Sequence, residues 1–239
     1  MVKIAVIGGG NVARHLMLAF SGCSNAEAVS VNSRTLSVLP MDADLYLIAV
    51  SDLAIKEVSD RLPEIKGVVA HTSGSVGISV LKKHFQAGVF YPLQTFSRND
   101  TVNYRQVPVF IECSSPEVSE VLYEAASLIT EKVYMANSQC RRYLHLAAVF
   151  ACNFTNRMFD IADSVLKKEG LDFSVLLPLV RQTVDKLERM SPHDAQTGPA
   201  ARGDLGICEK HISMLNDDEE TAFLYRILTE SIYNSRNSE

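Results

Sequence analysis

The chain begins MVKIAVIGGGNVARHLMLAF (residues 1–20), and the order of residue types in this stretch indicates the architecture of the first half. The β-branched run 2–7 predicts a strand, the glycines predict a turn, and apolar residues at helical spacing predict a helix after it. Gly8, Gly10 and Ala13 fit the pattern G-x-G-x-x-A, which makes a tight turn, admits a pyrophosphate to the backbone and packs helix against strand. Unpaired N–H groups at the start of such a helix attract an anion. The residues predicted to hold the pyrophosphate are Gly8, Gly10, Asn11 and Val12.

The second predicted strand ends in AVSVNSRT (28–35), where a dinucleotide-binding unit selects between NAD and NADP. An NAD site places an acid there against the ribose 2′-hydroxyl, but this segment contains none. Ser33 and Arg34 stand in its place, and a guanidinium with neighbouring hydroxyls suits a 2′-phosphate. The sequence therefore predicts NADP as the cofactor. The alternative is that Arg34 is a solvated loop residue.

Further strands are predicted from continuous apolar runs, and polar residues follow several of them. The run 45–50 indicates a strand buried on both faces, as parallel sheets require, so Ala49, Val50 and Ser51 should lie beside the cofactor. Strands that alternate with helices predict a doubly wound, mostly parallel α/β sheet of the Rossmann type.

Two polar clusters, 71–75 (HTSGS) and 91–97 (YPLQTFS), should end neighbouring strands at the carboxyl edge, where such sheets bind ligands. Ser73 is a predicted cofactor contact, and Gln94 and Thr95 are predicted substrate contacts. The alternative is that both clusters are ordinary hydrogen-bonded turns.

Strand signals stop after residue 136, and the rest of the chain reads as helices. One long helical pattern runs from about residue 138 to Gly170, and further helices are expected at 173–190, 200–215 and 219–234. This change predicts two domains, an NADP-binding domain at 1–136 and an all-α substrate and dimerisation domain at 137–239.

The segment RRYLHLAAVFACNFTNRMFD (141–160) places polar side chains on one stripe of a predicted helix. A solvated face would normally carry Lys and Glu, whereas Asn is a poor helix former, so the stripe indicates a half-buried cleft. His145 and Asn153 are the predicted catalytic residues, and Asn156 is a predicted substrate contact. The alternative is that they are satisfied polar groups of a core or an interface.

The loop SPHDAQTGPAARGD (191–204) breaks the chain before a helix that can start near residue 200. Gln196 and Arg202 are predicted substrate contacts, because Arg202 would lie in the positive first turn of that helix and could hold an acidic substrate. The alternative is an ordinary loop in which Arg202 pairs with Asp204.

Composition excludes several classes of function. A net charge of -5 without a basic block argues against nucleic-acid binding, and no apolar stretch approaches the roughly 20 residues of a membrane helix. The five cysteines are scattered without a C-x-x-C pair, so we expect reduced thiols, no disulfides and no metal site. No signal peptide is recognisable, and a cytoplasmic protein is therefore expected.

Six motifs, GGGNVA, DLYLIAVSD, HTSGS, GVFYPLQTFS, HLAAVFACNFTN and AQTGPAARGD, together resemble a group of bacterial proteins often described as NADP oxidoreductases. These combine a Rossmann-like domain with a helical C-terminal domain of unknown function. More remotely, the layout resembles the 6-phosphogluconate dehydrogenase superfamily, including ketopantoate reductase and pyrroline-5-carboxylate reductase. The resemblance implies a homodimer through the helical domain and a substrate cleft between the domains.

One departure bears on the reaction. Hydroxyacid dehydrogenases and ketopantoate reductase carry a catalytic lysine on the corresponding long helix, whereas no lysine lies between Lys132 and Lys167 here. His145 remains available to donate a proton. The sequence therefore predicts hydride transfer between NADP(H) and a small carbonyl, imine or cofactor-like substrate. The alternative is an NADP-binding sensor or interaction protein without chemistry.

Overall fold

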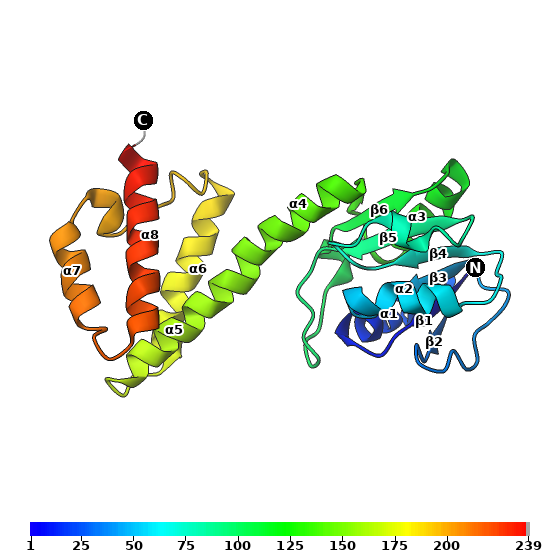
Figure 1. Cartoon of the computed structure of the whole chain (residues 1–239), viewed down its shortest axis with the longest axis horizontal. Helices are drawn as coiled ribbons and strands as arrows, with labels where there is room; N and C mark the ends of the chain where they lie inside the picture. The colour runs from blue at the N-terminus through cyan, green and yellow to red at the C-terminus, as the bar shows by residue number, and fades with distance from the viewer. Residues whose placement is uncertain (238–239) are drawn as a thin grey trace. The chain divides into compact units, whose positions relative to one another are not determined.

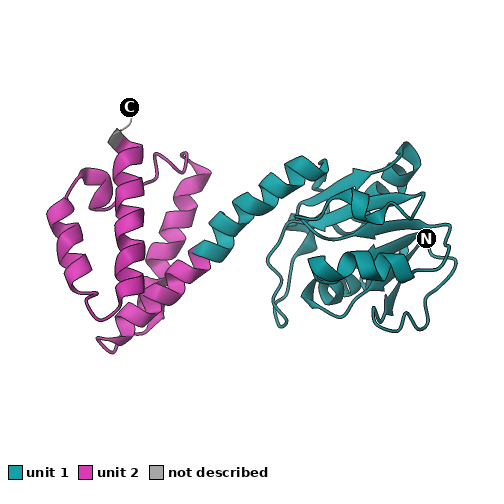
Figure 2. Ribbon diagram, viewed as in Figure 1, with its two compact units in different colours: residues 1–154 teal, residues 155–239 magenta. Residues whose placement is uncertain are grey.

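The computed structural model describes residues 1–237, and the chain divides into two compact units (Figure 2). Unit 1 is Met1–Phe154 and unit 2 is Thr155–Glu239. Residues 238–239, the last two of the predicted second domain, lie outside the described residues.

Unit 1 is built on a seven-stranded sheet in the order β2-β1-β3-β4-β5-β6-β7 (Figure 1). The strands are β1 Val2–Ile7, β2 Ala26–Val31, β3 Leu45–Ile48, β4 Val68–His71, β5 Ala87–Pro92, β6 Val109–Cys113 and β7 Val133–Met135. Only the β5–β6 pairing is antiparallel, which confirms the predicted mostly parallel, doubly wound sheet. The strand order reverses at β1, so the carboxyl ends of β1, β2 and β3 frame a crevice of the kind that binds ligands in such sheets.

Helices cover both faces of this sheet, as the apolar runs of the strands require. The helices of unit 1 are α1 Asn11–Ser21, α2 Asp52–Arg61, α3 Pro116–Ile129 and α4 Ser138–Ala148, with short turns η1 Ile78–Leu81 and η2 Tyr104–Gln106. Phe20 of α1 and Leu122 of α3 belong to one buried core cluster, whereas Ile55 of α2 and Leu81 of η1 belong to a second. All four residues of β3 are buried, in agreement with the prediction of a strand covered on both sides.

The long helical pattern that starts near residue 138 is not one α-helix. α4 is followed by a π-helix, η3 Val149–Phe154, and only then by α5 Thr155–Lys167. A π-turn holds more residues than an α-turn, so a uniform helical wheel loses its register beyond Ala148. Gly170 has a φ of 69°, as expected for the residue that ends a helix.

Unit 1 extends beyond the predicted domain boundary at residue 136, because it includes α4 and η3. Arg141 of α4 is fully buried and donates to the backbone oxygens of Ser73 and Val76, so the start of the predicted helical domain is fastened to the sheet.

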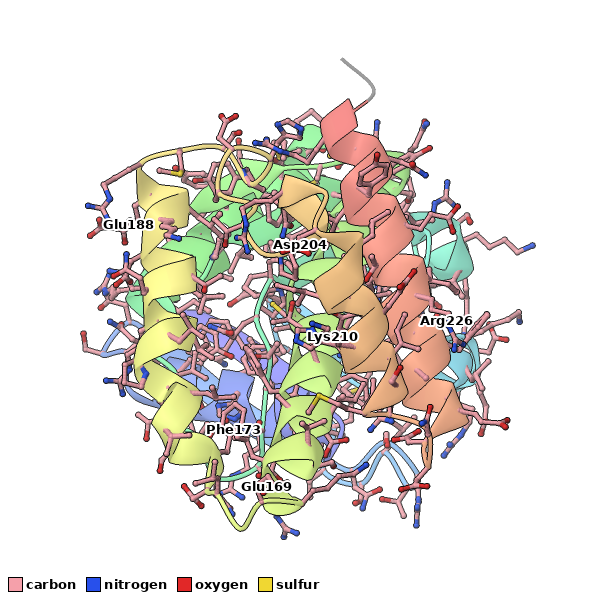
Figure 3. All side chains as sticks on the ribbon, turned by 90° about the vertical axis from the view of Figure 1, so that its left-hand side faces the viewer. Glu169, Phe173, Glu188, Asp204, Lys210 and Arg226 are labelled. Carbon is pink, nitrogen blue, oxygen red and sulfur yellow. The ribbon has the colours of Figure 1, made fainter. Side chains whose placement is uncertain are left out.

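Unit 2 is helical, and Figure 3 shows its side chains on the ribbon. Its elements are α5, η4 Phe173–Leu176, α6 Leu177–Asp185, η5 Lys186–Glu188, η6 Ala200–Arg202, α7 Leu205–Ser213 and α8 Glu219–Asn237. The expected helical C-terminal region is therefore confirmed, although the segment at 173–190 is divided into three pieces. No residue of α5 or α6 is buried.

The described part of the chain contains neither a membrane-spanning helix nor a cluster of side chains suited to a metal ion. None of its helices combines the length and the apolar character that a membrane span needs. No group of three or more His, Cys, Asp or Glu side chains is arranged to hold a metal ion among those residues.

Candidate functional site

A groove of about 1020 Å³ lies at the carboxyl ends of β1, β2 and β3 in unit 1. Of the predicted site residues it brings together Gly8, Gly10, Asn11, Val12, Ser33, Arg34, Ala49, Val50, Ser51 and Gln94. The lining residues that were not predicted as contacts are Gly9, Ser30, Asn32, Ser37, Val38 and Phe96. Gly9, Asn32 and Phe96 adjoin predicted residues, so contiguity along the chain could have found these three, whereas no such signal marks Ser30, Ser37 and Val38.

The glycine turn shapes the floor of this groove. Gly8 has a φ of 150°, and a Cβ there would lie 2.1 Å from the backbone oxygen of Ala49, so only glycine fits. A Cβ on Gly9 or Gly10 would meet nothing within 4 Å, so open space lies in front of their backbone. Gly10 caps α1 without a side-chain hydrogen bond, and the first turn carries no acid. The exposed N–H groups of this helix start fit a pyrophosphate.

The loop after β2 supplies the charge of the groove. Asn32 Oδ1 accepts hydrogen bonds from the backbone N–H groups of Arg34 and Thr35, at 2.8 and 3.4 Å. Among the described residues that line the groove, Arg34 carries the only charged side chain and no acid is present. This donor set fits a phosphate on the ribose better than a free 2′-hydroxyl.

The segment after β5 lies against the start of α1. Asn11 Nδ2 donates to the backbone oxygen of Phe96 at 2.9 Å, and His15 Nε2 lies 2.8 Å from that of Ser97. The His15 and Phe96 rings are 5.1 Å apart. The side chain of Asn11 therefore holds this segment, and its backbone N–H is the group free to serve an anion. Thr95 lies outside the groove lining, and its backbone N–H donates to Gln94 Oε1 at 2.8 Å.

Ser73 organises the turn after β4 and does not line the groove. Its Oγ accepts from the backbone N–H groups of Ser75 and Val76 at 3.1 and 3.0 Å. Its own N–H donates to His71 Nδ1 at 3.2 Å. The alternative of a hydrogen-bonded turn thus describes the position of Ser73 better than direct contact with a groove ligand does.

Tyr91 and His145 meet next to this turn. The Tyr91 Oη and His145 Nδ1 atoms are 3.2 Å apart. A Cβ on Gly74 would lie 2.7 Å from Tyr91 Cζ and 2.9 Å from His145 Nδ1, so the glycine leaves room for the pair. Burial raises the pKa of Tyr91, so its hydroxyl stays protonated and shares a hydrogen bond with His145 Nδ1. The sequence indicated both segments, but nothing in it paired them.

Arg141 fastens α4 beneath this pair, one helical turn before His145. Its guanidinium forms an ion pair with Glu112 of β6, and its Nε donates to the Ser73 backbone oxygen at 3.1 Å. Ser138 Oγ also donates to Glu112, at 2.8 Å. The sequence placed Arg141 on the polar stripe without a role. In the structure it joins the helix that carries His145 to the turn after β4.

His71 lies fully buried near the same ion pair. Burial lowers its pKa to about 4, and the positive charge of Arg141 acts in the same direction. Its Nε2 has no hydrogen-bond partner in the described structure. His71 is therefore neutral near neutral pH.

Asn153, the other predicted catalytic residue, is not part of the groove lining of unit 1. Within one chain Asn153 and Asn156 are exposed, and η3 shifts the register of the predicted stripe, so their role as site residues stays a prediction. In unit 2, Gln196 Nε2 donates to the backbone oxygen of Thr197 at 2.9 Å, and Arg202 is exposed in η6. Asp204 caps α7 by accepting from Ile207 N at 3.2 Å, which gives its carboxylate a role other than pairing with Arg202.

Comparison with known proteins gives three kinds of result. A domain of unknown function, DUF2520, matches residues 107–232. A structure from Bacteroides fragilis described as a "putative NADP oxidoreductase" is 35% identical, with a TM-score of 0.85, and 98% of each chain is covered. Among curated proteins, none matches the sequence.

Two more distant structures share the fold. The 1-pyrroline-5-carboxylate reductase of Streptococcus pyogenes is 14% identical, with a TM-score of 0.64, over 97% of this chain and 98% of that one. The pyrroline carboxylate reductase of Plasmodium falciparum, whose structure has NADP bound, is 10% identical with a TM-score of 0.60. The alignment covers 99% of this chain and 98% of that one. At these identities the likeness concerns the fold alone.

Proposed function

The chain belongs to the family defined by the domain of unknown function DUF2520, and from this membership and the glycine-lined groove we propose that it is an oxidoreductase that uses NADP(H). The observation that carries the proposal is the groove itself. It combines a helix start without a side-chain cap, two glycines that face open space and a single guanidinium. The similar structure from Bacteroides fragilis supports the same choice of cofactor.

The cofactor would be held by residues of unit 1. The backbone N–H groups at Gly10, Asn11 and Val12 would bind the pyrophosphate, and Arg34 with Ser33 would bind the 2′-phosphate. Ala49, Val50 and Ser51 follow β3 and would border the middle of the cofactor. Bound NADPH supplies a hydride to an acceptor, and the protein must position that acceptor and manage its proton.

The Tyr91–His145 pair is the group that we assign to proton transfer. A carbonyl needs a proton on oxygen as the hydride arrives at carbon, and the protonated imidazole of His145 would give it from Nε2 and become neutral, while Nδ1 keeps its hydrogen bond with Tyr91 Oη. Gln94 lines the groove on the side of β5, so its amide would orient the acceptor. We propose a small carbonyl, imine or cofactor-like molecule as the substrate.

A second copy of the chain is the protein partner that we propose, bound through the helical unit. The support is the number of large apolar side chains that unit 2 leaves exposed within one chain, among them Leu179 (63%), Val184 (59%) and Phe223 (62%). Surfaces of this kind are buried in obligate homodimers. All five cysteines are unpaired, which supports our further proposal that the protein acts in the cytoplasm.

Calorimetric titration with NADP⁺, NADPH and NAD⁺ tests the cofactor, and a screen of small ketoacids, imines and flavin-like acceptors for NADPH oxidation tests the reaction. We expect micromolar binding of NADPH, weaker binding of NAD⁺ and turnover of at least one acceptor. His145→Ala and Tyr91→Phe should lower turnover and leave NADPH affinity unchanged. Absence of NADPH binding would overturn the proposal. Binding without turnover on the whole panel would support a sensor instead, the function that the missing helix lysine favours.

A further inference from the structure

The loop after β2 is fastened to α2 by a residue outside the groove. Arg61, the last residue of α2, donates from Nη1 to the backbone oxygen of Ser33 at 3.3 Å and from Nη2 to that of Arg34. Within the described structure, Arg61 makes every hydrogen bond that joins these two residues to another helix or strand. Arg61 itself does not line the groove.

This arrangement fixes the two peptide planes on either side of Arg34. In the first plane the Ser33 carbonyl accepts from Arg61 while the Arg34 N–H donates to Asn32 Oδ1. In the second the Arg34 carbonyl accepts from Arg61 while the Thr35 N–H donates to the same Asn32 oxygen. Because peptide units are planar, holding both ends of each plane sets the direction in which the Arg34 side chain leaves the backbone.

The residues that follow show why such a fastening is needed. Leu36 has a φ of 52° and Val38 a φ of 56°, left-handed conformations that side chains with a Cβ rarely adopt. Val38 is also 81% exposed, so burial contributes little to holding it there. Strained, exposed backbone persists only where neighbouring contacts determine it, and Arg61 and Asn32 supply those contacts on the N-terminal side.

We propose that Arg61 is a positioning residue for the 2′-phosphate: it orients Arg34 from outside the groove and thereby sets the preference for NADP⁺ over NAD⁺. The proposal rests on the proposed function, because it presumes that the groove binds NADP⁺. Glu57, on the same helix, lies 3.7 Å from Arg61 Nη1 and offsets part of its charge. That pairing is consistent with Arg61 orienting the loop rather than attracting the 2′-phosphate over a long distance.

The test is calorimetric titration of the full chain with NADP⁺ and with NAD⁺, for the parent, Arg34→Ala, Arg61→Ala and the double variant. Arg61→Ala should weaken NADP⁺ binding about tenfold and change NAD⁺ binding less than about twofold, since neighbouring residues that act together couple by this amount. In the Arg34→Ala background the same change should have no further effect. Lys56→Ala is the control, because it removes a cation of α2 whose ion pair among the described residues is with Asp60. Melting temperatures confirm that each variant is folded.

The outcomes distinguish a failure of the proposed function from a failure of the role assigned to Arg61. Parent protein that binds neither nucleotide overturns the proposed function, whatever the variants do. Parent protein that prefers NADP⁺, with an unchanged preference in Arg61→Ala, overturns the role of Arg61 alone. Additive losses in the double variant would mean that Arg61 acts independently of Arg34, and this would also overturn the proposal. Full recovery by Arg61→Lys would assign the effect to charge rather than to the two-carbonyl contact, with the same consequence.

Discussion

Unit 1 and unit 2 treat apolar side chains in opposite ways. In unit 1 the strands and helices enclose two core clusters, and residues such as Phe20, Leu47 and Phe90 have no exposed surface. In unit 2, α5 and α6 bury no residue, while Leu179, Val184 and Phe223 are more than half exposed. Both sequences are rich in apolar residues at helical or strand spacing, so the difference lies in what each unit packs against.

The contrast indicates which contacts are complete within one chain. A doubly wound sheet buries both faces by its own helices, so unit 1 needs no partner for its core. A set of short helices has less interior, and unit 2 buries only Ala200, Cys208, Leu215, Thr221 and Ala222 among its described residues. We therefore expect unit 2 to depend on the proposed second copy for its stability.

The largest expected effect comes from placing charges at two exposed apolar positions of α6. The parent should sediment as a dimer, and the Leu179→Asp, Val184→Asp double variant as a monomer with reduced helical circular dichroism. Two apolar residues in each of two protomers correspond to a loss on the order of 6 kcal/mol of association. Leu53→Asp is the control, since Leu53 is 97% exposed on α2 of unit 1. A monomeric parent, or a double variant that still sediments as a dimer through unaffected helices, would contradict the proposed interface.

The same contrast separates what the sequence could predict from what it could not. The sequence predicts the β1–turn–α1 segment down to single glycines, because each requirement there is local. These requirements are an apolar strand run, a positive φ at Gly8 that favours glycine and a helix start without a side-chain cap. The contacts that complete the site are not local. Tyr91 and His145 are 54 residues apart in the chain, and Arg141 and Ser73 are 68 apart. Periodicity indicates which face a side chain occupies but not which partner it meets.

Asn153 and Asn156 illustrate the second limit. Their prediction as lining residues assumed 100° per residue throughout the long helix, and η3 breaks that assumption before either asparagine is reached. His145 lies before the π-helix, and its predicted half-buried position is found. The uniform helical wheel therefore applies only as far as Ala148, and no sequence signal marks the change of backbone geometry.

Ion pairs provide the next test of the contrast. Arg141 and Glu112 are paired in the interior of unit 1, where their side chains are 1% and 14% exposed, whereas Lys167 and Asp163 pair on the surface of unit 2. Arg141→Ala should lower the unfolding free energy of unit 1 by about 3–5 kcal/mol, because it leaves Glu112 without its cationic partner and two backbone oxygens without their donor. Hydrogen exchange of the β4 and β5 amides measures this loss. Lys167→Ala should leave the same amides unchanged; equal effects of the two variants would refute the distinction.

Acid should act on unit 1 through His71. The folded-state pKa is about 4 and the ordinary value is 6.5, so the folded protein binds fewer protons than the unfolded chain between these values. Well above pH 6.5 this shift does not change the free energy of unfolding. As the pH falls toward 4 the free energy of unfolding decreases, by about 2 kcal/mol at pH 5 and about 3 kcal/mol at pH 4. Burial and Arg141 cause the shift, while the Gly77 backbone, Asp52 and Glu112 oppose it.

His71→Asn removes this titration and keeps an oxygen that can accept from the Ser73 N–H, so the comparison concerns the pH slope and not the absolute stability. The parent should lose stability more steeply than the variant from pH 7 to pH 4, measured by hydrogen exchange of the sheet amides. His193→Asn is the matched change in unit 2, where the histidine is exposed, and its slope should follow that of the parent. Parallel slopes for the parent and His71→Asn would mean that water or a local opening solvates the His71 ring. The core of unit 1 would then be less closed than its burial indicates, and the contrast with unit 2 would be one of degree.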